Sequence, residues 1–273
     1  MQGNIAQSFA LVCVGNAYLH GRDVSGFWPN ASVFRFSKLC DFGVDDPAQP
    51  ASYRVIAADP LAWLASLRPN TTGLRLHAVP ATPAPTQVPG IEERMLVGFV
   101  GGGPRWLIEA VGETRSTLWQ AFDRLLDRND SERKIWANTY IPQGETEPQN
   151  APSTPLDLAA RDALDTVIAF AAKAAPGWDE YFRKARSVWE EGAAPNDDLT
   201  TYADIDPMGL RLLAMVQHAW AFGGMGSWND IGFTEAAQQS EYENVSERLF
   251  RALIAAIVAV ANSTFVARSA AAP

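Results

Sequence analysis

Short apolar runs alternate with polar turns along the first half of the chain, a pattern that predicts β-strands. Seven such runs are rich in β-branched or aromatic residues, which suit a pleated, half-buried surface. They cover residues 8–14, 32–39, 53–57, 74–79, 94–100, 105–111 and 134–141. Because turn residues bound most of these runs, we predict a mostly antiparallel sheet of about seven strands.

Two helices are expected to interrupt these strands. In the first, Asp59 can cap the helix, Pro60 can occupy its first position, and Pro69 ends it. The second is predicted over residues 114–128, where apolar residues recur at spacings that form one stripe on a helix. The stripe consists of Leu118, Trp119, Phe122, Leu125 and Leu126. We expect this helix to lie on the sheet.

The second half of the chain has the apolar periodicity of helices. Four are predicted, over residues 154–175, 178–191, 208–222 and about 240–262. The first begins with a cap, a first-turn proline and a first-turn acid at Thr154, Pro155 and Asp157. The last opens with Ser240 and Glu243 in capping-box spacing. Strands followed by a layer of about four helices predict the α+β fold class.

The division of the chain follows the same change of pattern. We predict a β-rich region with two helices over residues 1–145 and a helical region over residues 155–265. The polar, proline-punctuated segment 141–155 is the expected linker. Residues 266–273 are expected to form a disordered tail. The two regions are either separate units or one packed domain, and the sequence leaves both open.

Composition narrows the class of protein. Of the 273 residues, 47% are hydrophobic and 19% charged, which is typical of a folded globular protein. The 31 acidic and 22 basic residues give a net charge of −9. This charge disfavours binding to nucleic acid or to anionic membranes and suits a basic protein partner, although solubility is the commoner reason for such a charge.

The compartment is expected to be cytoplasmic. No apolar stretch is long enough to span a bilayer, and the first residues lack the basic region of a signal peptide. The two cysteines, Cys13 and Cys40, are expected to be buried thiols. A disulfide between them is an open alternative if their strands are neighbours.

Residues 220–230, WAFGGMGSWND, combine glycines with a serine and are the first candidate for chemistry. A nucleophile elbow needs glycines two residues before and after the serine, on a turn that follows a strand. Ser227 has neither, and a predicted helix precedes it. Gly223 is instead expected to be a left-handed residue that ends this helix. The glycines of residues 100–104 predict a hairpin turn rather than a phosphate-binding loop.

Metal and cofactor sites are not expected. The three histidines, His20, His77 and His218, lack zinc-ligand spacing. Four aspartates lie close together in the sequence: Asp197, Asp198, Asp204 and Asp206. This acidic cluster lacks the spacing of an EF-hand and is interpreted as a solvated loop. No complete catalytic or cofactor motif is present, so no catalytic residue is assigned.

Tryptophans in loops are the remaining candidates for recognition. Most of the nine tryptophans fit apolar helix stripes, but Trp28 and Trp228 fall in predicted loops. Trp228 either packs back onto the helices or presents an aromatic face to a partner. On the second interpretation, Trp228, Asn229, Asp230 and Trp28 form the predicted partner-binding surface.

Three functions follow, and the first is the leading hypothesis. It is a non-enzymatic, soluble, acidic binding protein, an inhibitor or immunity-type antagonist of a basic protein partner. The second is a hydrolase-like enzyme with an acid-base site between sheet and helices, formed by Asp230 with His218 or His20. The third is a structural protein that forms a homodimer through helix 240–262.

Overall fold

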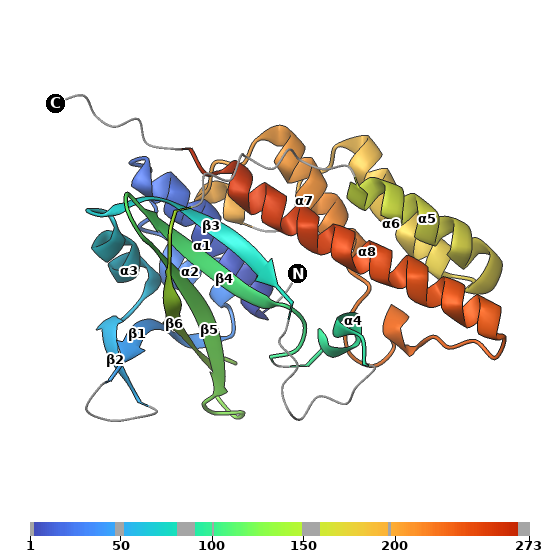
Figure 1. The fold of residues 1–273 in the computed structure, drawn as a ribbon, viewed down its shortest axis with the longest axis horizontal. Coiled ribbons are helices and arrows are strands. Elements are labelled where there is room, and N and C mark those ends of the chain that lie inside the picture. The colour runs from blue at the N-terminus through green and yellow to red at the C-terminus, as the bar shows by residue number, and fades with distance from the viewer. Residues whose placement is uncertain are drawn as a thin grey trace.

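A six-stranded mixed sheet forms one side of the molecule and four C-terminal helices form the other (Figure 1). The computed structural model describes residues 3–46, 52–80, 91–99, 101–148, 159–195 and 198–266. The strands are β1 (Ser37–Asp45), β2 (Tyr53–Ala57), β3 (Thr71–Val79), β4 (Arg105–Gly112), β5 (Ser116–Leu125) and β6 (Trp136–Thr146). They lie in the order β2-β1-β6-β5-β4-β3. Among the strands described, only the β1–β6 pair is parallel, and the other pairs are antiparallel.

The helices are placed in two groups. The described residues form α1 (Gly3–Leu19), α2 (Phe27–Asn30), α3 (Pro60–Leu67), α4 (Glu93–Leu96), α5 (Ala159–Ala174), α6 (Trp178–Glu191), α7 (Pro207–Ala219) and α8 (Ala236–Ser263). Helix α1 packs on β3 and β4, and α3 packs on β1 and β2. Helices α5 to α8 contact one another in successive pairs, and α8 also packs along α1 and β3. This confirms the α+β class, with the helical layer following the sheet.

Local signals that do not depend on distant packing predicted their elements well. Asp59 Oδ1 accepts the Ala62 N–H at 2.8 Å, and Pro60 opens α3, as expected. The helix predicted over residues 178–191, which Gly192 was expected to close, is α6, and Gly192 ends it in the left-handed conformation with φ of 69°. The predicted strands at residues 53–57, 74–79, 105–111 and 134–141 correspond to β2, β3, β4 and β6. The strand expected at residues 32–39 shifts, because Ser32–Phe34 form a 3-10 turn before β1.

The strand predicted at residues 8–14 is wrong, since these residues lie within α1. Every residue from Phe9 to Val14 is at most 1% exposed. A helix enclosed on all sides has no polar face, so its sequence lacks the 3.6-residue periodicity and resembles a buried strand. Residues 94–100 were also predicted as a strand, but Glu93–Leu96 form α4 and a turn follows.

The helix predicted over residues 114–128 is wrong in the opposite sense, because β5 occupies most of this segment. Trp119 faces the core, with its ring centroid 6.0 Å from that of Phe42 and 5.7 Å from that of Trp63. Phe122, three residues later, lies on the other face of the sheet and is 45% exposed. The apolar residues therefore cover both faces of a strand, and their spacing imitated one stripe of a helix.

Two asparagines attach the helices to the free edge of β3. Asn16 of α1 accepts the N–H of Leu74 at 2.7 Å and donates to its carbonyl at 3.0 Å. Asn262 of α8 makes the same pair of bonds with Leu76, at 2.7 and 3.0 Å. Each side-chain amide thus makes the two hydrogen bonds that a residue of a neighbouring strand would make. The backbone groups at this edge of β3 are therefore satisfied and not available for pairing with a strand of another molecule.

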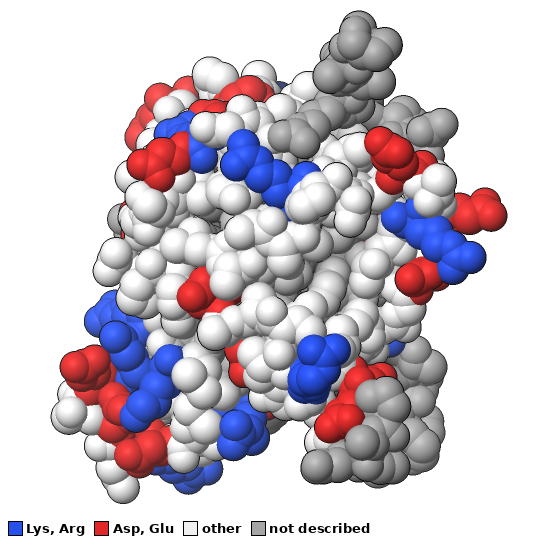
Figure 2. Space-filling view, turned by 90° about the vertical axis from the view of Figure 1, so that its left-hand side faces the viewer, with Lys and Arg blue, Asp and Glu red and all other residues white. Residues whose placement is uncertain are grey.

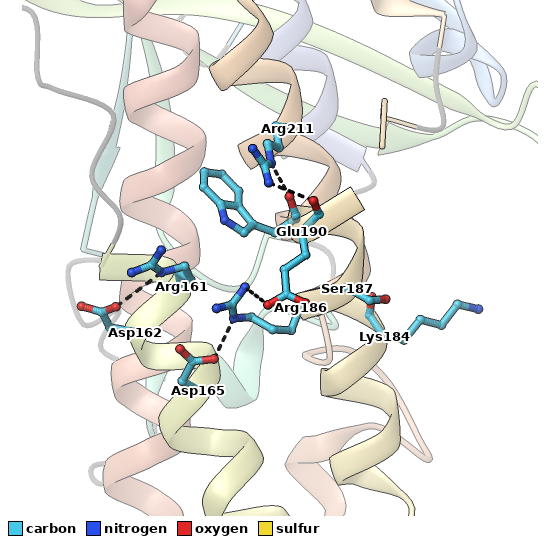
Figure 3. Close-up of polar contacts among 9 residues, drawn as sticks. Arg161, Asp162, Asp165, Lys184, Arg186, Ser187, Glu190 and Arg211 are labelled. Carbon is cyan, nitrogen blue, oxygen red and sulfur yellow. Dashed lines mark hydrogen bonds and ion pairs between the residues drawn. The ribbon is translucent and has the colours of Figure 1, made fainter. Parts of the chain in front are cut away.

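The helical region is anchored by charges at the end of α6 (Figure 3). Arg186 bonds to Asp165 of α5 at 2.8 Å and to Glu190 at 2.9 Å. Arg211 of α7 stacks on the Trp189 ring at 4.7 Å and donates to the carbonyls of Trp189 and Glu190. Because the last carbonyls of a helix carry partial negative charge, this arginine stabilises a terminus that also holds acidic side chains.

The predicted division of the chain is only partly described. Residues 141–146, at the start of the predicted linker, continue β6, and the division of the chain into two regions stays a prediction. Residues 149–158, with the expected helix start at residue 154, lie outside the described residues, as do residues 267–273 of the expected tail. One hydrophobic core includes residues of the sheet, α1 and all four C-terminal helices.

Two further expectations are resolved by the described residues. Helix α8 begins at Ala236, so Ser240 and Glu243 lie in its second and third turns and do not start it. Cys13 and Cys40 are buried and do not form a disulfide, as predicted. Among the helices described, none combines the length and the apolar character needed to cross a bilayer.

Candidate binding groove

A groove of about 1040 Å³ lies where the start of α1 meets the sheet. Its floor comes from α1, β1, β5 and β6. Residues 97–99, 101, 102 and 104, between α4 and β4, line the groove beside residues 217–224 at the end of α7. Segments far apart in the sequence therefore build one concave surface, the usual form of a ligand site.

A chain of polar side chains crosses the floor of the groove. Gln7 of α1 donates its Nε2 to Ser37 Oγ of β1 at 2.8 Å and to Asn138 Oδ1 of β6 at 3.3 Å. Ser37 Oγ donates to Asn138 Oδ1 at 2.5 Å. Asn138 Nδ2 in turn donates to Asp123 Oδ1 of β5 at 2.7 Å. These bonds hold the four side chains in fixed orientations.

Unused acceptors gather on the same floor. Gln7 is 4% exposed, and no donor among the described residues reaches its Oε1. The buried Asn4 Oδ1 is likewise without a donor in the described parts of the chain. Burial raises the pKa of Asp123, although hydrogen bonds from Asn138 and Asn4 partly oppose this. The floor is thus rich in acceptors that lack a matching donor.

The mouth of the groove is aromatic. Phe36 is 45% exposed and Phe99 is 69% exposed, which is high for phenylalanine. Trp136 and Trp220 are half-buried in the walls. Two arginines also line the groove: Arg35 stacks over the Phe36 ring at 5.2 Å, and Arg105 has a buried Nε with no acceptor among the described residues. The mouth therefore offers apolar surface beside two positively charged side chains.

The glycine-rich stretch 220–230 builds one wall of this groove. A Cβ on Gly98 would lie 2.5 Å from the carbonyl carbon and oxygen of Gly223, so the two backbones approach too closely for any side chain at residue 98. Arg94 of α4 donates to Asn229 Oδ1 at 3.0 Å, and Asn229 Nδ2 donates to the Arg94 carbonyl at 2.8 Å. The stretch thereby fixes α4 and the loop after it.

Gly223 was expected to end α7 in the left-handed conformation, and this is wrong. Gly223 is not among the described glycines with positive φ. Gly226, three residues later, is one of them, with φ of 81°. Helix α7 ends in extended backbone at Trp220. Ser227 Oγ then accepts the Asn229 N–H, so the serine caps the short 3-10 turn Trp228–Asp230.

The four predicted partner-binding residues do not form one exposed surface. Trp228 is completely buried, with its Nε1 donating to Ser246 Oγ at 2.7 Å, and Asn229 is 6% exposed. Asp230 is exposed and accepts the Gly226 N–H. Trp28 is half-buried against Phe34, with ring centroids 4.9 Å apart. Trp228 thus packs back onto the helices, and direct contact of these residues with a partner stays a prediction.

The acid-base pairs suggested for an enzyme are not in contact. No hydrogen bond or ion pair among the described residues joins Asp230 to His218 or His20. His218 Nδ1 bonds to the Ala214 carbonyl at 3.0 Å, and both nitrogens of His20 bond to backbone carbonyls. No group of three potential metal ligands occurs in the parts of the chain that the structure describes.

The glycines at residues 101–103 make a turn, but not the predicted hairpin. Gly101 and Gly103 have φ of 76° and 80°, which glycine adopts without steric cost. Because α4 precedes them, the turn connects a helix to β4, while Val100 lies outside the described residues. Two of the three glycines therefore adopt the positive φ values that were expected for a turn.

Sequence reasoning missed the residues of the floor. Gln7, Asp123 and Asn138 each interrupt an apolar run, which was the only available signal. Asp123 and Asn138 lie opposite each other in the antiparallel β5–β6 pair, and Gln7 reaches Asn138 from α1, a contact between distant residues that no local pattern indicates. Comparison with protein-family models, curated proteins and solved structures found no match. Function is therefore inferred from the groove itself.

Proposed function

We propose that the protein is a non-enzymatic binding protein that receives a segment of a basic protein partner in this groove, as an inhibitor or immunity-type antagonist would. The observation that carries the proposal is the pairing of an acceptor-rich floor with exposed aromatic side chains at the mouth. Aromatic residues exposed around a concave site are typical anchors of protein recognition. The net charge of −9 supports a basic partner by attracting it at long range.

The distribution of charge on one face of the molecule favours recognition at a defined site over general attraction to that face. On the face shown in Figure 2, basic and acidic side chains are mixed around a largely uncharged centre. A surface of this kind does not hold a basic protein by a uniform acidic field. Specific contacts in a groove would supply the selectivity that the net charge does not provide.

A homodimer through α8 has less support. The apolar residues of its C-terminal half are buried against the other helices of the same chain. They include Leu249, Leu253, Ile257 and Val260, all fully buried. The predicted dimer face is therefore already occupied by the chain's own core.

The proposal is tested by photo-crosslinking in cells of the source organism. A photoreactive phenylalanine analogue replaces Phe99 at the mouth of the groove, and a control carries it at Met208, which is 44% exposed at the start of α7. We expect one basic protein to crosslink from residue 99 and not from residue 208. Identical crosslinked proteins at both positions, or none from residue 99, would refute the proposal.

A further inference from the structure

We propose that the floor of the groove binds one basic side chain, an ammonium or guanidinium group, carried by the partner segment that enters between the aromatic walls. This inference rests on the proposed function and specifies what the groove recognises. It is carried by acceptors of three residues that line the groove from α1 and β5: Asn4 Oδ1 and Gln7 Oε1, which are buried and without a donor among the described residues, and the Asp123 carboxylate.

The orientation of the Gln7 amide is fixed by its surroundings. Its Nε2 lies within hydrogen-bond distance of three acceptors, at 2.8 Å from Ser37 Oγ, 3.2 Å from the Val33 carbonyl and 3.3 Å from Asn138 Oδ1. A rotated amide would place an oxygen against these acceptors. Oε1 is therefore held on the side without donors, where an unpaired buried acceptor lowers stability. A ligand N–H would satisfy it.

Asp123 supplies the charge that a cation needs. No cationic side chain among the described residues forms an ion pair with it. Its hydrogen bonds come from the neutral side-chain amides of Asn138 and Asn4. An entering cation would offset the cost of burying this carboxylate, and a charge-assisted bond in a partly desolvated site is stronger than a neutral one.

The rim limits the occupant to a single cation. Arg35 and Arg105 line the same groove and would repel a run of basic residues. Phe36 and Phe99 favour apolar neighbours on either side of the cation. The geometry thus fits one lysine or arginine flanked by apolar residues and excludes a polybasic segment.

The test uses three defined peptides and nuclear magnetic resonance of the whole ¹⁵N-labelled chain. The first is the blocked pentapeptide Gly-Leu-Arg-Leu-Gly, the second has glutamine in place of arginine, and the third is nona-arginine. The side-chain amide signals of Gln7 and Asn138 report on the floor directly. Asp123→Asn removes the charge while keeping the shape, and Asp45→Asn removes one from the exposed end of β1 as a matched control.

We expect the arginine pentapeptide to shift the Gln7 and Asn138 amide signals and to bind at least about tenfold more weakly to Asp123→Asn, with Asp45→Asn unchanged. Spectra of both variants confirm that they fold. Equal binding of the arginine and glutamine peptides, no shift at the floor amides, or tighter binding of nona-arginine with shifts elsewhere would each overturn the inference. If the arginine and glutamine peptides bind equally but a basic protein still crosslinks from residue 99, the inference about the floor is wrong and the proposed function is not contradicted.

Discussion

Replacing Trp228 by phenylalanine tests whether the glycine-rich stretch is a structural anchor. The indole is fully buried, and its ring centroid lies 5.1 Å from that of Phe182 and 5.3 Å from those of Trp178 and Tyr242. Its Nε1 donates to Ser246 Oγ at 2.7 Å. The substitution removes this bond and part of the packed ring while keeping one aromatic ring in place.

The expected cost follows from these contacts. The hydrogen bond contributes about 1 kcal/mol. The space vacated by part of the ring costs about 1–2 kcal/mol, a fraction of the roughly 3–5 kcal/mol typical of truncating a buried aromatic side chain to alanine. We therefore expect Trp228→Phe to lower the free energy of unfolding by about 2–3 kcal/mol. Trp136→Phe, at a half-buried position, should cost less than about 1 kcal/mol.

The assay is urea unfolding followed by far-ultraviolet circular dichroism, because the substitution removes a fluorophore. A double-mutant cycle with Ser246→Ala isolates the hydrogen bond, with an expected coupling energy of about 1 kcal/mol. A loss below about 0.5 kcal/mol for Trp228→Phe would refute the burial of the indole. Zero coupling would refute its bond to Ser246.

Three further changes test separate parts of the fold. Asn262→Ala leaves backbone groups of β3 unpaired and should cost about 1–3 kcal/mol in thermal unfolding, with increased association in light scattering. Gly98→Ala places a Cβ against backbone and should cost about 1–3 kcal/mol in urea unfolding. Its control, Gly224→Ala, meets no atom within 4 Å and should stay within about 0.5 kcal/mol. Burial alone would raise the pKa of Glu109, but its bond to His77 at 2.7 Å and nearby positive charge leave that pKa below the usual 4.5. A carboxyl group whose pKa is lower in the folded than in the unfolded protein stabilises the fold above its unfolded pKa, and this stability is lost as the pH falls through the folded pKa. We therefore expect the melting temperature to decrease when the pH is lowered below about 4.5. Glu109→Gln should make the melting temperature less dependent on pH in this range.

Each of these expectations has a contradicting result. Unchanged stability of Asn262→Ala would mean that water satisfies the edge of β3 equally well. Equal stability of Gly98→Ala and Gly224→Ala would show that the two loops separate at no cost. For Glu109, a pH dependence that persists unaltered in the glutamine variant would assign the acid sensitivity to other carboxyl groups.

The elements that sequence predicted correctly carry their own boundary signals. Asp59 with Pro60 begins α3 through bonds within one turn, and Gly192 ends α6 through its own backbone conformation. Such signals act over a few residues, so they need no knowledge of the fold. The strands with turns on both sides were found for the same reason.

The errors have a common physical origin in apolar residues on more than one face of an element. Helix α1 lies between the sheet and α8, so its residues are apolar all round and the helical period is lost. Strand β5 has apolar residues on both faces, Trp119 inward and Phe122 outward, so the alternation of a strand is lost. In both cases tertiary position, which a local pattern does not contain, decided the secondary structure.

The candidate site could not be predicted from the sequence because its residues come from separate elements that only the fold brings together, and they form no sequence motif. Residues 220–230 attracted attention by composition, and that composition serves to hold the groove's wall: Gly223 lies against Gly98, Asn229 binds α4, and Trp228 anchors the turn in the core. The floor residues Gln7 and Asp123, which lack any such local signature, are the ones left with unused hydrogen-bonding capacity or an unpaired charge. A conspicuous stretch thus supports the site, while inconspicuous polar residues supply its chemistry.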